Sequence, residues 1–229
     1  MKKLLDRIFI DGLGGMAQGL FATLIIGTII QQIGLFMGGG TGDLIYELGK
    51  IAAGLTGAGI GVGVARKLEA GHLVIVSAAV VGMIGAFAGK ILSGQVLVDG
   101  NLVLAGPGEP LGAFAAAYLA IEIGILISGK TKLTPLVCIG TGSAVGLFVG
   151  PPISEFMLWL GSLINWGTEQ QPFLMGIVVS VLMGMILTLP ISSAALGVIL
   201  NLSGLAAGAA TIGCCCNMNG FAVASWREN

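Results

Sequence analysis

Residues 187–221 read LTLPISSAALGVILNLSGLAAGAATIGCCCNMNGF, and this stretch decides what kind of fold the chain can adopt. It is uncharged and apolar enough for a bilayer, yet Pro190 interrupts it, and Ser192 and Ser193 follow at once. Lipid cannot hydrogen-bond the backbone groups that a proline frees, so the segment must lie against protein or a water-filled cavity. We therefore expect a broken or re-entrant helix, as in transporter substrate sites. The alternative is a simple proline-kinked span.

The rest of the chain has the composition of an all-α integral membrane protein. Of its 229 residues, 55% are hydrophobic and 9% are charged, whereas a soluble domain carries about 25% charged residues. The apolar runs are continuous and near span length, which predicts helices rather than the alternating strands of a barrel. A net charge of −1 gives no reason to expect a nucleic-acid partner.

Glycine is unusually frequent, with 40 residues, and in lipid it lets helix backbones approach closely. Two spans carry small residues at every fourth position, which predicts close helix contacts along one face. The two stripes are Ala53, Gly57, Gly61 and Ala65, and Cys138, Gly142, Gly146 and Gly150.

The apolar runs predict about seven transmembrane helices in a single transmembrane domain over residues 1–229. Residues 1–11 place their apolar side chains on one helical face and predict an amphipathic helix at the interface; a charged cap on the first span is the alternative. Residues 187–221 form the broken segment, and the loop 94–110 should hold a small hairpin around Asp99-Gly100-Asn101. The expected spans are 12–36, 44–65, 73–93, 111–129, 133–153, 172–189 and 191–211.

Loop charges predict the orientation of these spans. Seven basic residues fall on one side and two on the other, which places the N-terminus in the cytoplasm. The seven are Lys2, Lys3, Arg7, Arg66, Lys67, Lys130 and Lys132, and the two are Lys50 and Lys90.

Short motifs also recur in the same order in two sets of three spans. The sequence DGLGGMA, from Asp11, resembles EPLGAFA, from Glu109, and similar Gly-containing pairs follow in the next two spans. The first set starts inside and the second outside, so this would be an inverted 3+3 repeat, an architecture that many secondary transporters use. Chance similarity in a Gly- and Ala-rich chain is the alternative.

Several polar side chains at membrane depth could bind a ligand. Glu122 lies inside the fourth span, where an ionisable group usually faces protein or a wet cavity. It could hold substrate hydroxyls, bind a proton, pair with Lys90 or join two helices. Glu109 starts the same span between two prolines, as either a ligand or a group favoured by the helix dipole. Gln18 and Asn217 offer neutral amides, which suit a polyhydroxy ligand or a contact between helices.

We expect no metal site, no cofactor and no catalytic residue in this chain. Three consecutive helical residues point about 100° apart, so the cysteines at 214–216 cannot readily converge on one ion, and no second cluster completes a tetrahedral set. Small packing residues are the better interpretation. His72, the only histidine, is expected to be a solvated loop residue rather than a phosphoryl carrier.

Four motifs together resemble a known family. They are PGEPLG at 107–112, PISSAA at 190–195, GCC at 213–215 and GFAV at 220–223. The chain resembles the membrane (IIC) component of bacterial sugar phosphotransferase systems, and in particular the branch that includes perfringolysin regulator-like membrane proteins. The resemblance implies a carbohydrate permease of the bacterial cytoplasmic membrane, with site roles for Glu109, Ser192 and Ser193. It also implies a separate IIB subunit whose cysteine carries the phosphoryl group.

The chain departs from that family in two respects. It has no recognisable IIA or IIB domain, so catalysis would need partner subunits. Relatives usually continue with more membrane segments beyond the position of Trp226, which predicts a truncated or reduced form.

Three functions stay open at this point: a sugar permease-like subunit, a non-transporting membrane sensor that regulates gene expression, and a small-solute or ion transporter unrelated to phosphotransfer. The expected partners are a carbohydrate or another small polar solute, the lipid bilayer, a IIB subunit and a second copy of the chain.

Overall fold

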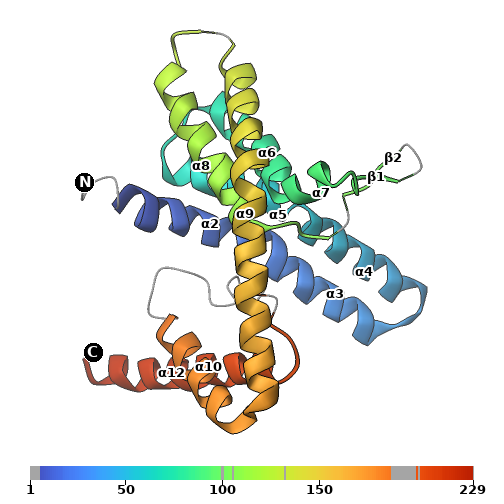
Figure 1. The fold of residues 1–229 in the computed structure, drawn as a ribbon, viewed down its shortest axis with the longest axis vertical. Helices are drawn as coiled ribbons and strands as arrows, with labels where there is room; N and C mark the ends of the chain where they lie inside the picture. Colours follow the sequence, from blue (N-terminus) through green and yellow to red (C-terminus); the bar gives the residue numbers. More distant parts are fainter. Residues whose placement is uncertain are drawn as a thin grey trace. The chain divides into compact units, whose positions relative to one another are not determined.

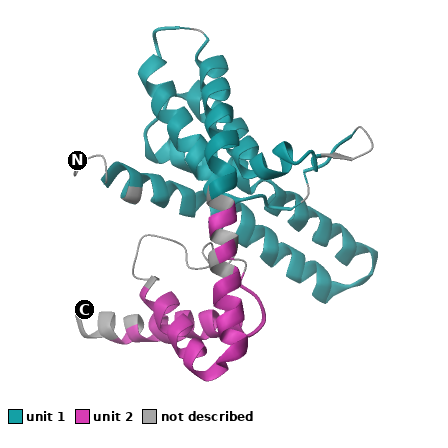
Figure 2. Cartoon of the chain, in the orientation of Figure 1, with its two compact units in different colours: residues 1–154 teal, residues 155–229 magenta. Residues whose placement is uncertain are grey.

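The computed structural model describes residues 6–98, 101–104, 106–131, 133–186, 200 and 202–228. These residues are almost entirely helical (Figure 1). The chain splits into two compact units, Met1–Ser154 and Glu155–Asn229 (Figure 2).

The first unit begins with one uninterrupted helical run. It consists of a π-helical turn η1 (Arg7–Gly12), α2 (Leu13–Leu20), a second π-helical turn η2 (Phe21–Ile25) and α3 (Ile26–Met37). The helices α4 (Gly39–Gly54) and α5 (Thr56–Lys67) follow, and then α6 (His72–Ala86) and the short α7 (Ala88–Leu92). The unit ends with α8 (Pro110–Ile127) and the first part of α9 (Thr134–Gln170).

Between α7 and α8 lies the hairpin that the sequence predicts. Strand β1 (Leu97–Val98) pairs antiparallel with β2 (Asn101–Leu102), in the register Leu97 to Leu102.

Glycine contacts hold the helices of the first unit together. A methyl group on Gly57 of α5 would lie 2.6 Å from the carbonyl oxygen of Gly82 in α6, and one on Gly85 of α6 would lie 2.6 Å from that of Gly112 in α8. Side chains larger than hydrogen cannot occupy these positions without moving a helix, as expected for small-residue stripes in membranes. The core around them is fully buried and includes Ile60, Val64, Val74, Val81 and Ile121.

The second unit is built from the rest of α9, from α10 (Pro172–Ile186) and from α12 (Gly204–Glu228). Its core consists of Val179, Met183 and Ala210. The backbone N–H of Ser203 donates to Asn165 Oδ1 at 3.1 Å, which ties the start of α12 to α9.

The helical membrane class is confirmed. Within the described residues, three helical stretches are long and apolar enough to cross a membrane: Ile10–Met37, Pro110–Ile127 and Thr134–Pro152. A fourth candidate is the pair α4 and α5, bent by 49°, and α6 and α10 are shorter apolar helices. These are three to four candidate spans, against about seven expected, and residues 191–199 and 201 of the expected span 191–211 lie outside the described residues.

Three expected helix bounds are wrong. The helix expected over 44–65 breaks at Leu55, and the one over 73–93 breaks at Phe87, although neither position has a proline. The helix expected over 133–153 runs on to Gln170 and holds Pro151 and Pro152 inside it. Proline's fixed φ of about −65° is itself helical, so a helix can continue through both prolines, although each removes one backbone hydrogen bond.

Candidate binding site at two helix breaks

The two helix breaks of the first unit lie side by side. The α4–α5 break at Leu55 is followed by Gly57, in the first turn of α5, and the α6–α7 break at Phe87 follows Ala86. A methyl group on Gly57 would lie 2.9 Å from the Ala86 Cβ atom, so the start of α5 touches the end of α6. We call this place the break junction.

The loop before α8 completes the break junction. The backbone N–H of Glu109 donates to the Ala86 carbonyl oxygen at 2.7 Å, and carbonyls in the last turn of a helix lack partners within that helix. Gly108 has φ +70°, and a methyl group there would lie 2.7 Å from Ala86 Cβ. Only glycine therefore suits position 108, both for its backbone angle and for its closeness to α6.

The Glu109 side chain makes no hydrogen bond to the described residues around this junction. It precedes α8 at the N-cap position but makes no capping hydrogen bond. Its Oε1 atom is buried and has no hydrogen-bond partner among the described residues. Burial raises the pKa of Glu109 from 4.5 to about 7. Without a hydrogen-bond partner there, the carboxyl can either accept a hydrogen bond from a ligand or carry a proton.

Glu122, the other acidic candidate on α8, is already paired. Arg7 Nε lies 2.6 Å from Glu122 Oε1, and Arg7 Nη2 lies 3.3 Å from Oε2. The described ion pair is thus with Arg7, whereas the sequence had offered Lys90. At 1.5 Å per residue, about 20 Å of helix separates Glu122 from Glu109, so the two carboxyls do not share one site.

Gln18 lies exposed on α2, at the edge of a groove of about 370 Å³. Leu55, at the first helix break, also lines this groove. The groove lies along the face of α5 that meets α2, whereas Gly57 of the break junction meets α6. The other lining residues are small or apolar: Gly19, Ala22, Thr23, Ala58, Gly59, Val62 and Gly63.

The remaining candidates belong to the second unit or lie outside the described residues. Asn217 donates its side-chain N–H to the Gly184 carbonyl oxygen and so joins α12 to α10. The expected broken segment around Pro190, with Ser192 and Ser193, is among the residues that the structure does not describe.

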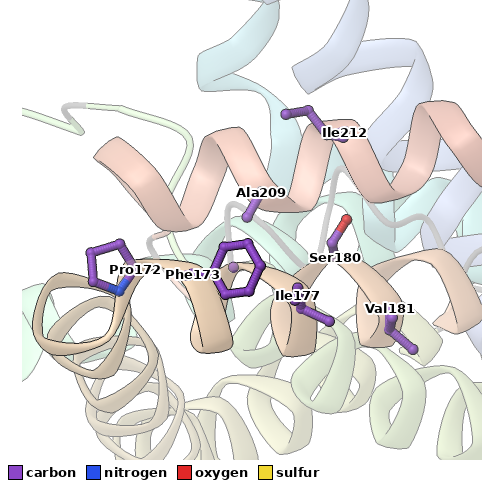
Figure 3. A pocket seen from close by; sticks show the side chains of 8 residues that line it. Pro172, Phe173, Ile177, Ser180, Val181, Ala209 and Ile212 are labelled. Carbon is purple, nitrogen blue, oxygen red and sulfur yellow. The ribbon is translucent and has the colours of Figure 1, made fainter.

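A second groove of about 370 Å³ lies between α10 and α12 (Figure 3). Phe173 and Ile177 of α10 line it, as do Ala209 and Ile212 of α12, and Ser180 is its one hydroxyl. Such a lining offers little to a polyhydroxy ligand, so this groove is a poorer sugar site than the break junction.

Among the described residues, no group of three His, Cys, Asp or Glu side chains is placed to hold a metal ion. Within the cysteine triplet, Cys214 points its thiol at the Met183 carbonyl oxygen, while Cys215 and Cys216 are exposed.

The apolar spans and the two adjacent helix breaks define a multi-pass helical membrane protein. Comparison with protein families makes the class specific: the model described as "Phosphotransferase system, EIIC" matches residues 10–229. The chain therefore belongs to the EIIC family of the phosphotransferase system, and the resemblance drawn from the four short motifs is confirmed. No curated protein and no solved structure matches the chain.

Sequence reasoning missed the partner of Glu122 and the two helix breaks that form the break junction. The sequence analysis used Arg7 as one of the basic residues that predict orientation, whereas in the structure its side chain forms an ion pair with Glu122 of α8. The breaks at Leu55 and Phe87 have no proline to mark them, and the available signal was weak: each is followed by a short residue and then a glycine.

Proposed function

We propose that this chain is the sugar-permease-like membrane component of a bacterial phosphotransferase system and that it binds a carbohydrate at the break junction. Family membership supports the permease class. The single observation that supports the site is the buried Oε1 atom of Glu109, which has no hydrogen-bond partner among the described residues. A buried acceptor without a partner is costly, and a sugar hydroxyl would satisfy it.

The helix breaks would supply further groups for the same ligand. Broken helices expose backbone N–H and C=O groups, and transporters use such groups around substrates at membrane depth. Gln18 is also proposed to bind the ligand through its amide, from the groove between α2 and α5. Ser192, Ser193 and Asn217 remain proposed substrate-binding residues on the evidence of the sequence alone, the two serines through the motif PISSAA. Glu122 we assign to holding α8 rather than to the substrate.

The finer architecture is part of this proposal. About seven spans would form one transmembrane domain, with residues 187–221 as the broken segment and with the two sets of three spans inverted relative to each other. The loop charges support a cytoplasmic N-terminus in the bacterial cytoplasmic membrane. A separate IIB subunit would phosphorylate the bound sugar, and a second copy of the chain would complete the assembly.

Ligand-induced thermal stabilisation tests the site. Purified protein in detergent would be melted with a panel of sugars and sugar phosphates, since a ligand that binds the native state raises the melting temperature. At a concentration of 100 times Kd, the gain is about 2.7 kcal/mol. We expect Glu109→Gln to lose the response and Glu47→Gln to keep it, because Glu47 is exposed and forms an ion pair with Lys50 at the surface. A full response from Glu109→Gln would refute the proposed site.

One observation favours an alternative function. A carboxyl with a pKa of about 7 is suited to carry a proton at physiological pH, as a proton-coupled transporter of a small solute would require. Uptake into vesicles separates the possibilities: phosphotransfer needs the partner subunits, and proton coupling needs a pH gradient. Sugar binding with neither kind of uptake would indicate a sensor.

A further inference from the structure

The π-helical turn η1, near the N-terminus, is attached to α8 through side chains. Arg7 of η1 and Glu122 of α8 are 115 residues apart in sequence and form a two-point ion pair, at 2.6 and 3.3 Å. Beside them, a methyl group on Gly12 would lie 3.2 Å from the Phe114 ring. The Tyr118 hydroxyl is close enough to interact electrostatically with both charges.

These contacts lie on one face of α8. Phe114, Tyr118 and Glu122 follow each other at intervals of four, so their side chains line the same side of the helix. The Phe114 and Tyr118 rings lie 5.8 Å apart. The backbone of η1 continues directly into α2 and lies against α5, and the long side chains of Arg7, Phe114 and Glu122 make its attachment to α8.

The opposite face of α8 is held differently. Gly112, Ala116, Ala120 and Gly124 form that face, and backbone contact dominates there. A methyl group on Gly112 would lie 2.7 Å from the Gly85 carbonyl oxygen. The Cys138 thiol of α9 donates to the Ala120 carbonyl oxygen at 3.0 Å, and a methyl group on Gly124 would lie 2.6 Å from that sulfur. Cys138 is fully buried by these contacts.

The two faces differ in how easily they can separate. Parting the glycine face uncovers close-packed backbone, whereas parting the other face breaks the Arg7–Glu122 ion pair and the side-chain contacts of Phe114 and Tyr118. The side chains of Arg7 and Glu122 are 39% and 30% exposed, so the pair lies at the surface of the first unit rather than in its core. A contact of that kind has two discrete states, paired and released, which a conformational switch requires.

We propose that the Arg7–Glu122 pair is a releasable latch: while it is closed it fixes α8 from the side opposite α9, and when it opens α8 can shift towards η1 and away from α9, which uncovers Cys138. The latch uses no atom of Glu109 and does not depend on what the break junction binds.

The thiol of Cys138 is a built-in reporter for this movement. The chain has four cysteines, so replacing Cys214, Cys215 and Cys216 by Ser leaves Cys138 as the single reactive group. In that background, the labelling rate with a small membrane-permeant maleimide would be measured for Arg7→Gln, for Glu122→Gln and for the charge swap Arg7→Glu with Glu122→Arg. Lys50→Gln is the matched control, because it breaks an exposed ion pair with Glu47 in the same unit.

We expect each single variant to label several-fold faster than the parent and the charge swap to return toward the parent rate, with Lys50→Gln unchanged. Unchanged labelling in both single variants would overturn the latch. A charge swap that labels as fast as the single variants would also overturn it, because the effect would then come from damaged packing rather than from the pair.

Arg7→Lys keeps the charge and guards against variants that fail to fold. It should label between the parent and Arg7→Gln, since a lysine cannot reproduce the two-point contact. Labelling needs no sugar, so a negative result here leaves the sugar-binding test intact, and the reverse also holds.

Discussion

Replacing Gly85 by Ala should force α8 away from α6 and destabilise the first unit. The added methyl carbon would lie 2.6 Å from both the Gly112 carbonyl oxygen and the Ala116 Cβ atom, and 3.1 Å from the Ala113 Cα atom. Ordinary contacts begin near 3.4 Å, and none of these three atoms is the end of a flexible side chain. Relief therefore requires the helices to part by nearly an ångström.

The magnitude follows from two opposing effects. Overpacking a close contact costs about 1–3 kcal/mol, while Gly→Ala in a helix recovers up to about 1 kcal/mol of propensity. The net loss should be up to about 2 kcal/mol, which at roughly 2–4 °C per kcal/mol lowers the melting temperature by several degrees. Because Ala86 next to it accepts the Glu109 N–H, stabilisation by a bound sugar should weaken as well.

Gly140→Ala in α9 is the matched control, because a methyl group there would meet nothing within 4 Å. It makes the same chemical change in a helix of the same unit and should be neutral or slightly stabilising. The assay is thermal unfolding of both purified variants in the same detergent. Equal melting temperatures for the two variants would refute the close α6–α8 contact.

Three further changes test other parts of the structure. The pKa of Glu109 is raised to about 7 from an ordinary 4.5, so the folded state binds the Glu109 proton more tightly than the unfolded state does. The stability that this proton contributes is lost as pH rises through about 7. Between about pH 5 and about pH 8 the melting temperature of the parent should therefore fall more than that of Glu109→Gln, and parallel curves would contradict this. Asn217→Ala removes the hydrogen bond to Gly184 and should destabilise the second unit by about 1 kcal/mol, seen as faster proteolysis of that unit than in Cys216→Ala. Thr56→Val removes the buried hydrogen bond to the Ala53 carbonyl, 2.6 Å long, and should cost about 1 kcal/mol at the α4–α5 bend; no shift in the thermal melt would refute a stabilising role for that bond.

Where a residue of restricted backbone geometry marks the start of a helix, the predicted helix start agrees with the structure. The span expected over 111–129 is observed as Pro110–Ile127, since Pro110 starts the helix and its fixed φ suits the first turn. The glycine stripe at 57 and 61 packs on α6 as expected, because a period of four places both residues on one face. Such signals are local, and local signals can be read from one sequence.

The helix breaks could not be read in the same way. Pro151 and Pro152 predict an end where α9 continues, while Leu55 and Phe87 look like ordinary span residues and yet interrupt their helices. At Phe87 the deciding partner is distant in sequence: the Glu109 N–H bonds the Ala86 carbonyl that the end of α6 leaves free. A break stabilised from another segment leaves little trace at its own position.

The partner of Glu122 could not be predicted from the sequence either. In the fourth span the sequence YLAIEIGILI is apolar on all sides except at Glu122, so the pattern cannot tell which face meets other helices and which meets Arg7. Packing decides it: the small side chains at Gly112, Ala116 and Gly124 let neighbouring backbones come close. The bulky and charged side chains are then left on the other face. An acidic side chain on that face of α8 needs a cation from another segment, and Arg7 of η1 supplies it. The position of Glu122 relative to the glycine face thus forecasts a partner but not its identity, and charge-swap rescue is the measurement that ties Arg7 to it.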